Sequence, residues 1–350
     1  MNPSEELKVL HLIHWNRSGI TTLVRSICEK KGHSLILLEN DNDFDSYYSC
    51  VPEKFCARGN ILNLVMMINR IKPDVIQAHS FTPLLVSMLF FKRSKVIFHV
   101  HNEYPYFYNK DLKSILKRNI LKIAHKTSRF RVVCVSQESG RAVKRITGSD
   151  FRIVVNGLPD QGKVRENFVN EKDRHRFYSV CRLNEQKNLV YAIRIIERLK
   201  NAGFSDVSYD IYGDGDMRDF LLSEIGSRGL DSNVRLKGYV DSPEELANNY
   251  DYYLSTSLYE GFGLSIADAL RGNNIAIISK VGDLVRYLQN EKDAFFLTLN
   301  EDEDFAVLKN LFHLDDVEKS RVQLRAREKY LEFFTQEKMF SELESVYSSL

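Results

Sequence analysis

Short apolar runs alternate along the chain with longer stretches of helical periodicity. The runs are uninterrupted and rich in β-branched residues, which is typical of strands buried on both faces of a parallel sheet. In the first half they lie at residues 7–13, 34–38, 75–78, 95–100, 131–135 and 152–155, with helices expected at 20–31, 62–71, 84–91, 112–124 and 138–146. This alternation predicts a doubly wound α/β domain with right-handed crossovers.

The rhythm breaks at residues 156–174, where Asn-Gly, Leu-Pro and a run of charges predict a linker. It then restarts, with strands expected at 176–180, 207–212, 234–237, 251–255, 274–278 and 294–297, and helices at 189–201, 217–229, 243–249, 264–270 and 284–288. The charged tail from residue 301 is also expected to be helical. We therefore expect a Rossmann-like domain at 1–157, a linker at 158–174, a second Rossmann-like domain at 175–334, and a helix at 335–350 that packs back towards the first domain.

Composition adds few constraints. With 43% hydrophobic and 27% charged residues the chain is typical of a globular protein, and a net charge of +2 indicates no particular partner. The five cysteines are scattered without CxxC spacing, which argues against a disulfide framework or a zinc site. The first residues lack an apolar signal-peptide core, and no run approaches the roughly 18 to 20 apolar residues of a membrane span. These features predict a cytoplasmic location without a transmembrane anchor.

Two cations follow the first strand of the second half. Arg182 and Lys187 stand between that strand and a helix expected to begin near Asn188. Helix N-termini favour anions, and two cations at such a position suit a diphosphate. Taken alone, these residues could equally be solvated surface cations.

Two later strand ends carry glycines and carboxylates. Gly213 and Gly215 follow the strand at 207–212, where the absence of a side chain lets a backbone approach a ligand, although a simple turn is the more common explanation of such a segment taken alone. Glu260 lies on a glycine-rich loop before the helix at 264–270, and Asp268 lies one turn into that helix. Ionised carboxylates can accept several hydrogen bonds from sugar hydroxyls. The alternative is one capping acid and one surface acid.

In this order, the three segments resemble the retaining glycosyltransferases of family four, which have the GT-B fold. The resemblance lies in Arg182-Leu183 with Lys187-Asn188, in the Gly-x-Gly after the next strand, and in Glu-Gly-Phe-Gly-Leu from Glu260. It extends over nearly the whole chain and implies two facing Rossmann-like domains with a cleft between them.

The resemblance implies a role for each donor-side residue. Arg182 and Lys187 would hold the donor diphosphate, and Glu260 would contact the transferred sugar. Asp268 stands where the family usually has Glu and would bond the ribose hydroxyls. Further donor-binding positions would be Gly19, Gly213, Gly215, Gly263 and Leu264, with backbone groups near Tyr239 and Val240 holding the base.

The first half would supply the acceptor side. Gly19 resembles the second glycine of the family's glycine loop, whose first glycine is Ser18 here. His101 follows the strand at 95–100 and would face the transferred sugar, so we take His101 and Glu260 as the catalytic candidates. His79 and His99 are interpreted as hydrogen-bonded structural histidines.

The mechanism is expected to need neither a metal nor a cofactor. The sequence has no DxD or metal-ligand cluster after a strand, so phosphate charge would be neutralised by Arg182, Lys187 and a helix N-terminus. The resemblance implies retention, with the leaving diphosphate taking the acceptor proton. The donor would be a nucleotide diphosphate sugar that carries a hexose or N-acetylhexosamine, and UDP is the expected nucleotide because it is common in the family. The acceptor would be a glycan or lipid-linked glycan in cell-surface polysaccharide biosynthesis.

The helix expected at 112–124 is basic and follows a cluster of aromatic residues. Its cations are Lys113, Lys117, Lys122, Lys126 and Arg129. Such a helix can dock on an anionic leaflet, here the inner face of the cytoplasmic membrane, or can simply present a solvated face. Nucleic-acid binding is not expected, because no recognition motif accompanies the patch.

Two other functions are compatible with this fold. A sugar-nucleotide epimerase of GT-B architecture is disfavoured by the Glu-Gly-Phe-Gly-Leu segment, whereas a non-catalytic sugar-nucleotide binder is compatible with Ser18 and Asp268. A nicotinamide dehydrogenase is not supported, since G-x-G-x-x-G is missing after the first strand.

Overall fold

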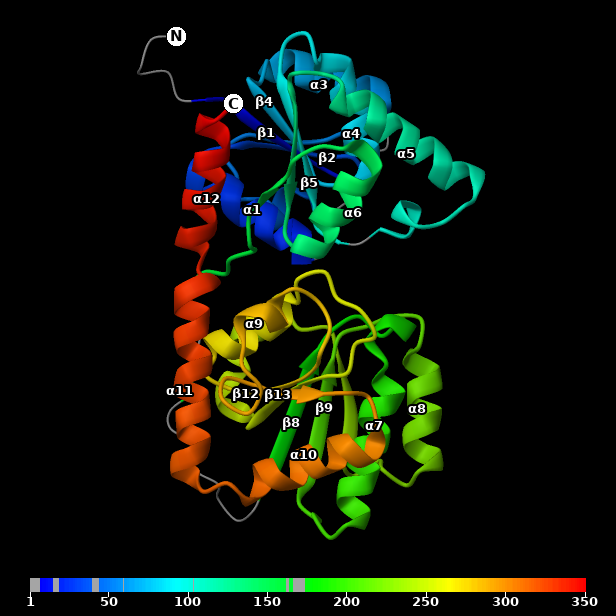
Figure 1. Cartoon of the computed structure of the whole chain (residues 1–350), viewed down its shortest axis with the longest axis vertical. Helices are drawn as coiled ribbons and strands as arrows, with labels where there is room; N and C mark the ends of the chain where they lie inside the picture. The colour runs from blue at the N-terminus through cyan, green and yellow to red at the C-terminus, as the bar shows by residue number, and fades with distance from the viewer. Residues whose placement is uncertain are drawn as a thin grey trace. The chain divides into compact units, whose positions relative to one another are not determined.

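The structure is a computed structural model that describes residues 7–14, 19–39, 44–58, 60–102, 104–161, 164–165 and 174–350 (Figure 1). It divides into two compact units. Unit 1 comprises Met1–Gly157 and Glu337–Leu350, and unit 2 comprises Leu158–Gln336. Each unit is an α/β structure around one parallel sheet, which confirms the predicted fold class.

Unit 1 contains a seven-stranded sheet of order β3-β2-β1-β4-β5-β6-β7, in which every described pair of neighbours is parallel. Its strands are β1 (Val9–Ile13), β2 (Ser34–Leu37), β3 (Lys54–Cys56), β4 (Val75–Ala78), β5 (Lys95–Val100), β6 (Phe130–Cys134) and β7 (Arg152–Ile153). The strand order reverses between β1 and β4. Ligands of doubly wound sheets bind beyond the carboxyl ends of the strands at such a switch point.

Helices cover both faces of this sheet. They are α1 (Gly19–Lys31), α2 (Phe44–Tyr47), α3 (Ile61–Ile71), α4 (Phe81–Ser87), α5 (Leu112–His125), α6 (Gln137–Thr147) and α12 (Gln336–Ser348). Apolar residues of α1 and α12, among them Ile27 and Leu343, pack with Val9, Val75 and Ile97 on one face. Residues of α3, α5 and α6 pack on the other face. In Figure 1, the red C-terminal helix α12 accordingly lies beside the blue α1.

Unit 2 contains a six-stranded parallel sheet of order β10-β9-β8-β11-β12-β13. The strands are β8 (His175–Val180), β9 (Val207–Tyr212), β10 (Val234–Gly238), β11 (Tyr252–Ser255), β12 (Ile275–Ser279) and β13 (Phe295–Leu297). The order reverses between β8 and β11, so this unit too has a switch point, and the loops after these two strands meet there.

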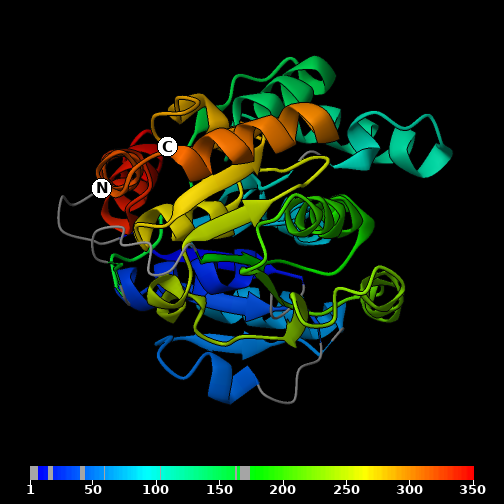
Figure 2. The same ribbon diagram turned by 90° about the horizontal axis from the view of Figure 1, so that it is seen from below.

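Helices flank the sheet of unit 2, which Figure 2 shows from below. They are α7 (Leu189–Asn201), α8 (Arg218–Ser227), α9 (Leu264–Arg271), α10 (Glu301–His313) and α11 (Asp316–Phe333). Residues of α7, α8 and α10 share a core with Tyr252 on one face of the sheet. Neighbouring Tyr253 points to the other face, because side chains alternate along a strand, and its hydroxyl bonds Ser265 of α9 at 2.7 Å.

The structure differs from the expectations in several places. β3 was not expected, because three residues are too few to show a pattern. Residues 243–249 and 284–288 form short 3-10 turns rather than α-helices, and the first of them begins at Pro243. Arg165, in the expected linker, is buried, because its guanidinium pairs with the buried carboxylate of Asp251 at 2.7 Å. Within the described residues, none of the helices has the length and apolar composition needed to cross a membrane.

Candidate functional site

An ion pair stands at the switch point of unit 2. Lys187 lies in the turn after β8, Glu260 lies on the loop after β11, and Lys187 Nζ pairs with Glu260 Oε1. The side chains are only 17% and 10% exposed, so water screens the pair weakly. Glu260 Oε1 also accepts a hydrogen bond from the hydroxyl of Ser257 at 2.7 Å. The fold thus brings together two residues that are 73 positions apart in the sequence.

Further hydrogen bonds tie these two loops together. The Thr256 hydroxyl lies within reach of the carbonyls of Lys187 and Asn188, at 3.1 and 3.0 Å. The Leu258 N–H donates to the carbonyl of Gln186 at 2.8 Å, and the Gln186 amide donates to the carbonyl of residue 259, also at 2.8 Å. These bonds fix the two loops relative to each other and hold the ion pair in place.

Gly213 and Gly215 are required by the packing of the chain beside Arg182. A Cβ on Gly213 would overlap the carbonyl oxygen of Cys181, and one on Gly215 would overlap that of Leu183. The loop after β9 therefore lies directly against the segment that carries Arg182, whose side chain is exposed. The prediction that these glycines let a backbone approach a ligand remains a prediction; the structure shows close backbone packing as a further requirement for them.

The other donor-side candidates occupy α9 and the end of β10. Gly263 precedes α9 with a φ of +90°, and Leu264 is the first residue of that helix. Asp268 Oδ1 bonds Arg271 Nε at 2.8 Å; burial raises the pKa of the Asp268 carboxyl, and the guanidinium opposes that rise. Tyr239 and Val240 follow β10, and Tyr239 is 64% exposed.

Sequence reasoning missed Gly282. Its φ is +79°, and a Cβ there would lie 2.9 Å from the Cβ of Glu260. Any larger residue would push against the loop that carries the carboxylate. A glycine shortly after the strand at 274–278 was the available signal, but it is too common a feature to single out.

The candidates in unit 1 lie around its own switch point. Gly19 is the exposed first residue of α1, and Ser18 lies outside the described residues. His101 comes directly after β5 and is 3% exposed. His79 comes directly after β4, and its Nδ1 lies 2.8 Å from His101 Nε2.

His79, His99 and His101 therefore form a buried cluster, in which the rings of His99 and His101 stack at 4.2 Å. Burial lowers the pKa of His99 to about 3 and holds the pKa values of His79 and His101 well below their usual range, so all three are neutral at pH 7. Their potential ligand nitrogens lie within 4.8 Å of one another, the kind of grouping that can hold a metal ion. However, His79 and His101 already direct nitrogens at each other.

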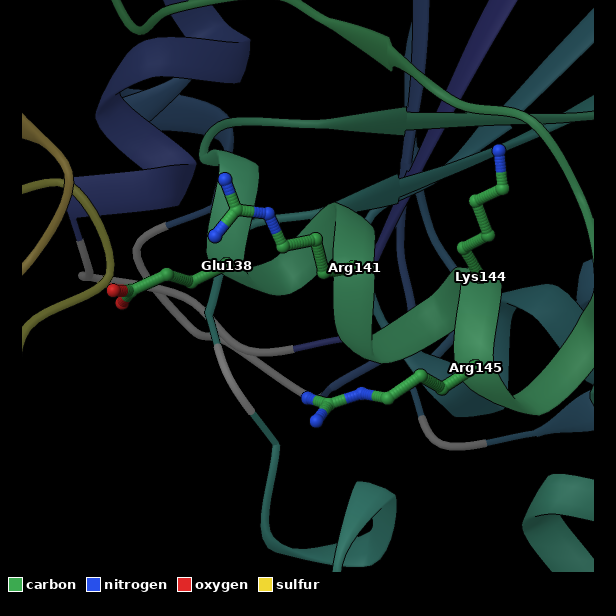
Figure 3. A pocket seen from close by; sticks show the side chains of 4 residues that line it. All are labelled: Glu138, Arg141, Lys144 and Arg145. Atoms are coloured by element: carbon green, nitrogen blue, oxygen red, sulfur yellow. The ribbon is translucent and has the colours of Figure 1, made fainter.

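A charged hollow in unit 1 was not predicted. It is lined by Glu138, Arg141, Lys144 and Arg145, which project from α6 (Figure 3). Lys144 pairs with Asp150 at 2.8 Å. The spacing of three and four residues places charges on one helix face, but such spacing is equally common on solvated helices.

The comparisons with known proteins agree with this architecture. Residues 39–161 match the family Glycosyltransferase Family 4, and residues 160–329 match the family Glycosyl transferases group 1. Among solved structures, Anabaena HepE in complex with UDP superposes with a TM-score of 0.81 at 18% identity, covering 98% of this chain and 100% of the other. The family matches define a glycosyltransferase, and the superposition shows that its fold is GT-B.

Relatives with named functions are also glycosyltransferases. The O-antigen biosynthesis glycosyltransferase WclY of Escherichia coli is 22% identical over 95% of this chain and 94% of its own length. The poly(ribitol-phosphate) alpha-N-acetylglucosaminyltransferase of Staphylococcus aureus is 26% identical over 46% of this chain. That match spans 32% of the relative's length, and the match to the poly(glycerol-phosphate) alpha-glucosyltransferase of Bacillus subtilis spans 14%. Together with the family matches, these findings show that the chain belongs to the family 4 type of GT-B glycosyltransferases.

Proposed function

We propose that this protein transfers a hexose or N-acetylhexosamine from a nucleotide diphosphate sugar to a glycan or lipid-linked glycan of the cell surface. UDP is the favoured nucleotide. The observation that carries the proposal is the ion pair of Lys187 and Glu260 at the switch point of unit 2, with Arg182 on the adjoining segment. The relatives named for O-antigen and poly(ribitol-phosphate) glycosylation support the acceptor class. Structures of HepE with UDP and with UDP-glucose support the donor class.

The ion pair suggests how the donor is received. A diphosphate offers Lys187 a stronger anionic partner than one carboxylate, and Arg182 can bind a second oxygen. When Lys187 turns to the diphosphate, Glu260 Oε1 loses that partner but keeps its bond from Ser257. The carboxylate, still oriented, is then free to accept hydrogen bonds from hydroxyls of the transferred sugar.

The remaining roles follow the family resemblance. In this proposal His101 contacts the transferred sugar, backbone near Gly19 faces the phosphates, and Asp268 bonds the ribose. Transfer proceeds with retention, without a metal or cofactor, and the leaving diphosphate takes the acceptor proton. Positioning and electrostatic stabilisation supply the rate enhancement.

A ligand-binding experiment tests the donor site before any acceptor is known. Binding to the native state alone raises the melting temperature, so UDP-glucose, UDP-N-acetylglucosamine and GDP-mannose are compared by thermal shift. We expect a UDP-sugar to stabilise the chain, and Lys187→Gln to abolish the shift. Lys309→Gln, on the exposed surface of α10, is the matched control. A shift that Lys187→Gln retains in full would refute this donor site.

Turnover is tested by nucleotide release. We expect the purified chain to release UDP from the stabilising donor when a lipid-linked glycan is added, and NMR of the product to show retention at the anomeric carbon. Donor binding without release or hydrolysis would instead favour the non-catalytic binder.

We also propose that α5 contacts an anionic membrane. Helix α5 lies at the periphery of unit 1 (Figure 1), with Leu112, Leu116 and Ile123 between 59% and 86% exposed. Exposed apolar residues beside cations are what an interfacial helix requires. The exposed cations on and after the helix are Lys113, Lys122, Lys126 and Arg129. Lys117 differs, since its Nζ lies 4.7 Å from the centre of the Tyr106 ring, which it covers.

A further inference from the structure

Four histidines of unit 1 form a single hydrogen-bonded line. His101 Nε2 faces His79 Nδ1 at 2.8 Å, His79 Nε2 faces His11 Nδ1 at 2.9 Å, and His11 Nε2 faces His33 Nδ1 at 2.9 Å. Every link joins an Nδ1 to an Nε2 in the same direction. His11, His79 and His101 are at most 3% exposed, whereas His33 is half-buried at the edge of the unit.

The rings of this line lie end to end. Successive ring centres are 5.1, 5.2 and 5.2 Å apart, and successive planes differ by 24°, 21° and 20°. Each separation equals one hydrogen bond plus two ring radii, so the ring nitrogens point at one another nearly within the ring planes. This is the alignment that a hydrogen bond between imidazoles requires. The 4.2 Å contact of His99 with His101 is face-to-face stacking and lies outside the line.

Chemistry restricts this line to two fully bonded arrangements. A neutral imidazole carries one N–H and one acceptor nitrogen. Because every link runs from Nδ1 to Nε2, the four rings carry hydrogen either all on Nε2 or all on Nδ1. Any mixture would place two hydrogens or two lone pairs in one link. The tautomer of His101 at one end of the line therefore fixes the tautomer of His33 at the other end.

We propose that His101, His79, His11 and His33 form a proton relay between the carboxyl end of the sheet and the surface. His101 Nδ1, at the inner end, has no hydrogen-bond partner among the described residues. When a proton binds there, His101 Nε2–H passes its proton to His79 Nδ1, and the same step repeats through His11 to His33. His33 Nε2–H then releases one proton to water. One proton enters and one leaves, and every ring ends neutral with its hydrogen on Nδ1.

The relay has a use in sugar transfer, and this part rests on the function proposed above. In the proposed function the leaving diphosphate takes the acceptor proton directly, and the relay adds a second route for that proton. On this route the acceptor O–H bond breaks, an N–H bond forms at His101 Nδ1, and one proton leaves at His33. The reverse sequence takes a proton from water and delivers it from His101 Nδ1 to an oxygen of the leaving diphosphate. This restores the first arrangement, so the relay resets once in each turnover.

The surroundings of His99 provide an internal control. The Tyr347 hydroxyl bonds Gln77 Oε1 at 2.6 Å, and Gln77 Nε2 lies 2.7 Å from His99 Nδ1. His99 is as buried as His11, but its one polar side-chain contact is with Gln77, and the proton path of the relay does not pass through it. His99→Phe and His11→Phe each remove one buried imidazole while keeping an aromatic ring, and they differ in whether the line is cut.

The first test needs no activity. Imidazole ¹⁵N shifts of the full-length protein at neutral pH distinguish Nδ1–H from Nε2–H in each ring. We expect the four relay histidines to show the same tautomer, or the same ratio of tautomers, because their links are coupled. Different tautomers at His33 and His101 would overturn the relay, whatever the protein transfers.

The second test is kinetic. We expect His11→Phe and His33→Phe to lower kcat about tenfold or more with little change in KM, since general acid–base steps contribute at least this much. His99→Phe should keep a kcat close to that of the unaltered chain. In mixtures of water and deuterium oxide, kcat should depend non-linearly on deuterium content in the unaltered chain and linearly in His33→Phe. A linear dependence in both would overturn the relay in catalysis. If the four histidines share one tautomer but the protein has no transferase activity, the proposed function is refuted and the relay is not.

Discussion

Acid should unfold unit 1, because four uncharged histidines are buried in it and a fifth, His33, is half-buried. Burial lowers the pKa of His33 to about 4 and that of His99 to about 3, and it holds the pKa values of His11, His79 and His101 well below their usual range. The unfolded chain regains ordinary histidine pKa values near 6.5. Below that pH the unfolded state binds more protons than the folded state, so stability falls as pH falls.

The magnitude follows from linkage. A histidine that stays neutral when folded but titrates near 6.5 when unfolded loses about 2 kcal/mol of folding free energy by pH 5. Five such groups together lose roughly 10 kcal/mol, which lies within the total stability of about 5–15 kcal/mol usual for a domain. We therefore expect unit 1 to unfold between about pH 6 and pH 5.

Urea unfolding at a series of pH values measures this dependence. Peptide-resolved hydrogen exchange of β1, β4 and β5 assigns it to unit 1. Each buried neutral histidine contributes a slope of about 1.4 kcal/mol per pH unit below its unfolded pKa. His99→Phe should reduce the slope by one such step. A free energy of unfolding that is flat from about pH 7 to pH 5, or a slope that His99→Phe leaves unchanged, would refute the reasoning.

Three further predictions concern single substitutions. Asp251→Ala should destabilise unit 2 by about 3–5 kcal/mol in urea unfolding, because it leaves two arginine side chains without their buried partner. Gly213→Ala should cost about 2–4 kcal/mol, since its Cβ would overlap the Cys181 carbonyl, whereas Gly203→Ala, with a φ of +100° but open space, should cost only about 1 kcal/mol. Leu116→Glu, at an exposed site, should leave the melting temperature unchanged and weaken sedimentation with phosphatidylglycerol vesicles; equal sedimentation with neutral vesicles would contradict the membrane proposal.

Much of the fold was predictable because its signals are local. The strands of unit 2 appear as continuous apolar runs, and Arg182, Lys187 and Glu260 could be placed at strand ends from their order alone. The Lys187–Glu260 pair could not be predicted, because strand order decides which loops become neighbours, and the pattern along one chain does not state that order. The overlap that makes Gly213 obligatory has the same origin.

The histidine line shows this limit most clearly. His79, His99 and His101 could each be assigned to a strand end, and His11 lies within the first predicted strand. Period-two alternation predicts that His99 and His101 share a face. It does not predict the register that places His11 of β1 opposite Gln77 of β4, or the strand order that places β4 between β1 and β5. These two features of the sheet align the rings. His33, which precedes β2, carried no signal of its own.

The same line also bears on why these residues are present. On a sheet face covered by α1 and α12, apolar side chains would pack without losing hydration, and a buried polar group stabilises little even when it is hydrogen-bonded. The neighbouring positions on this face, Val9, Val75 and Ile97, follow that rule. The polar residues instead cluster towards the carboxyl ends of β4 and β5, where doubly wound sheets bind ligands. Departures from the local pattern are expected at functional sites, so their concentration here favours a role in chemistry over a role in folding.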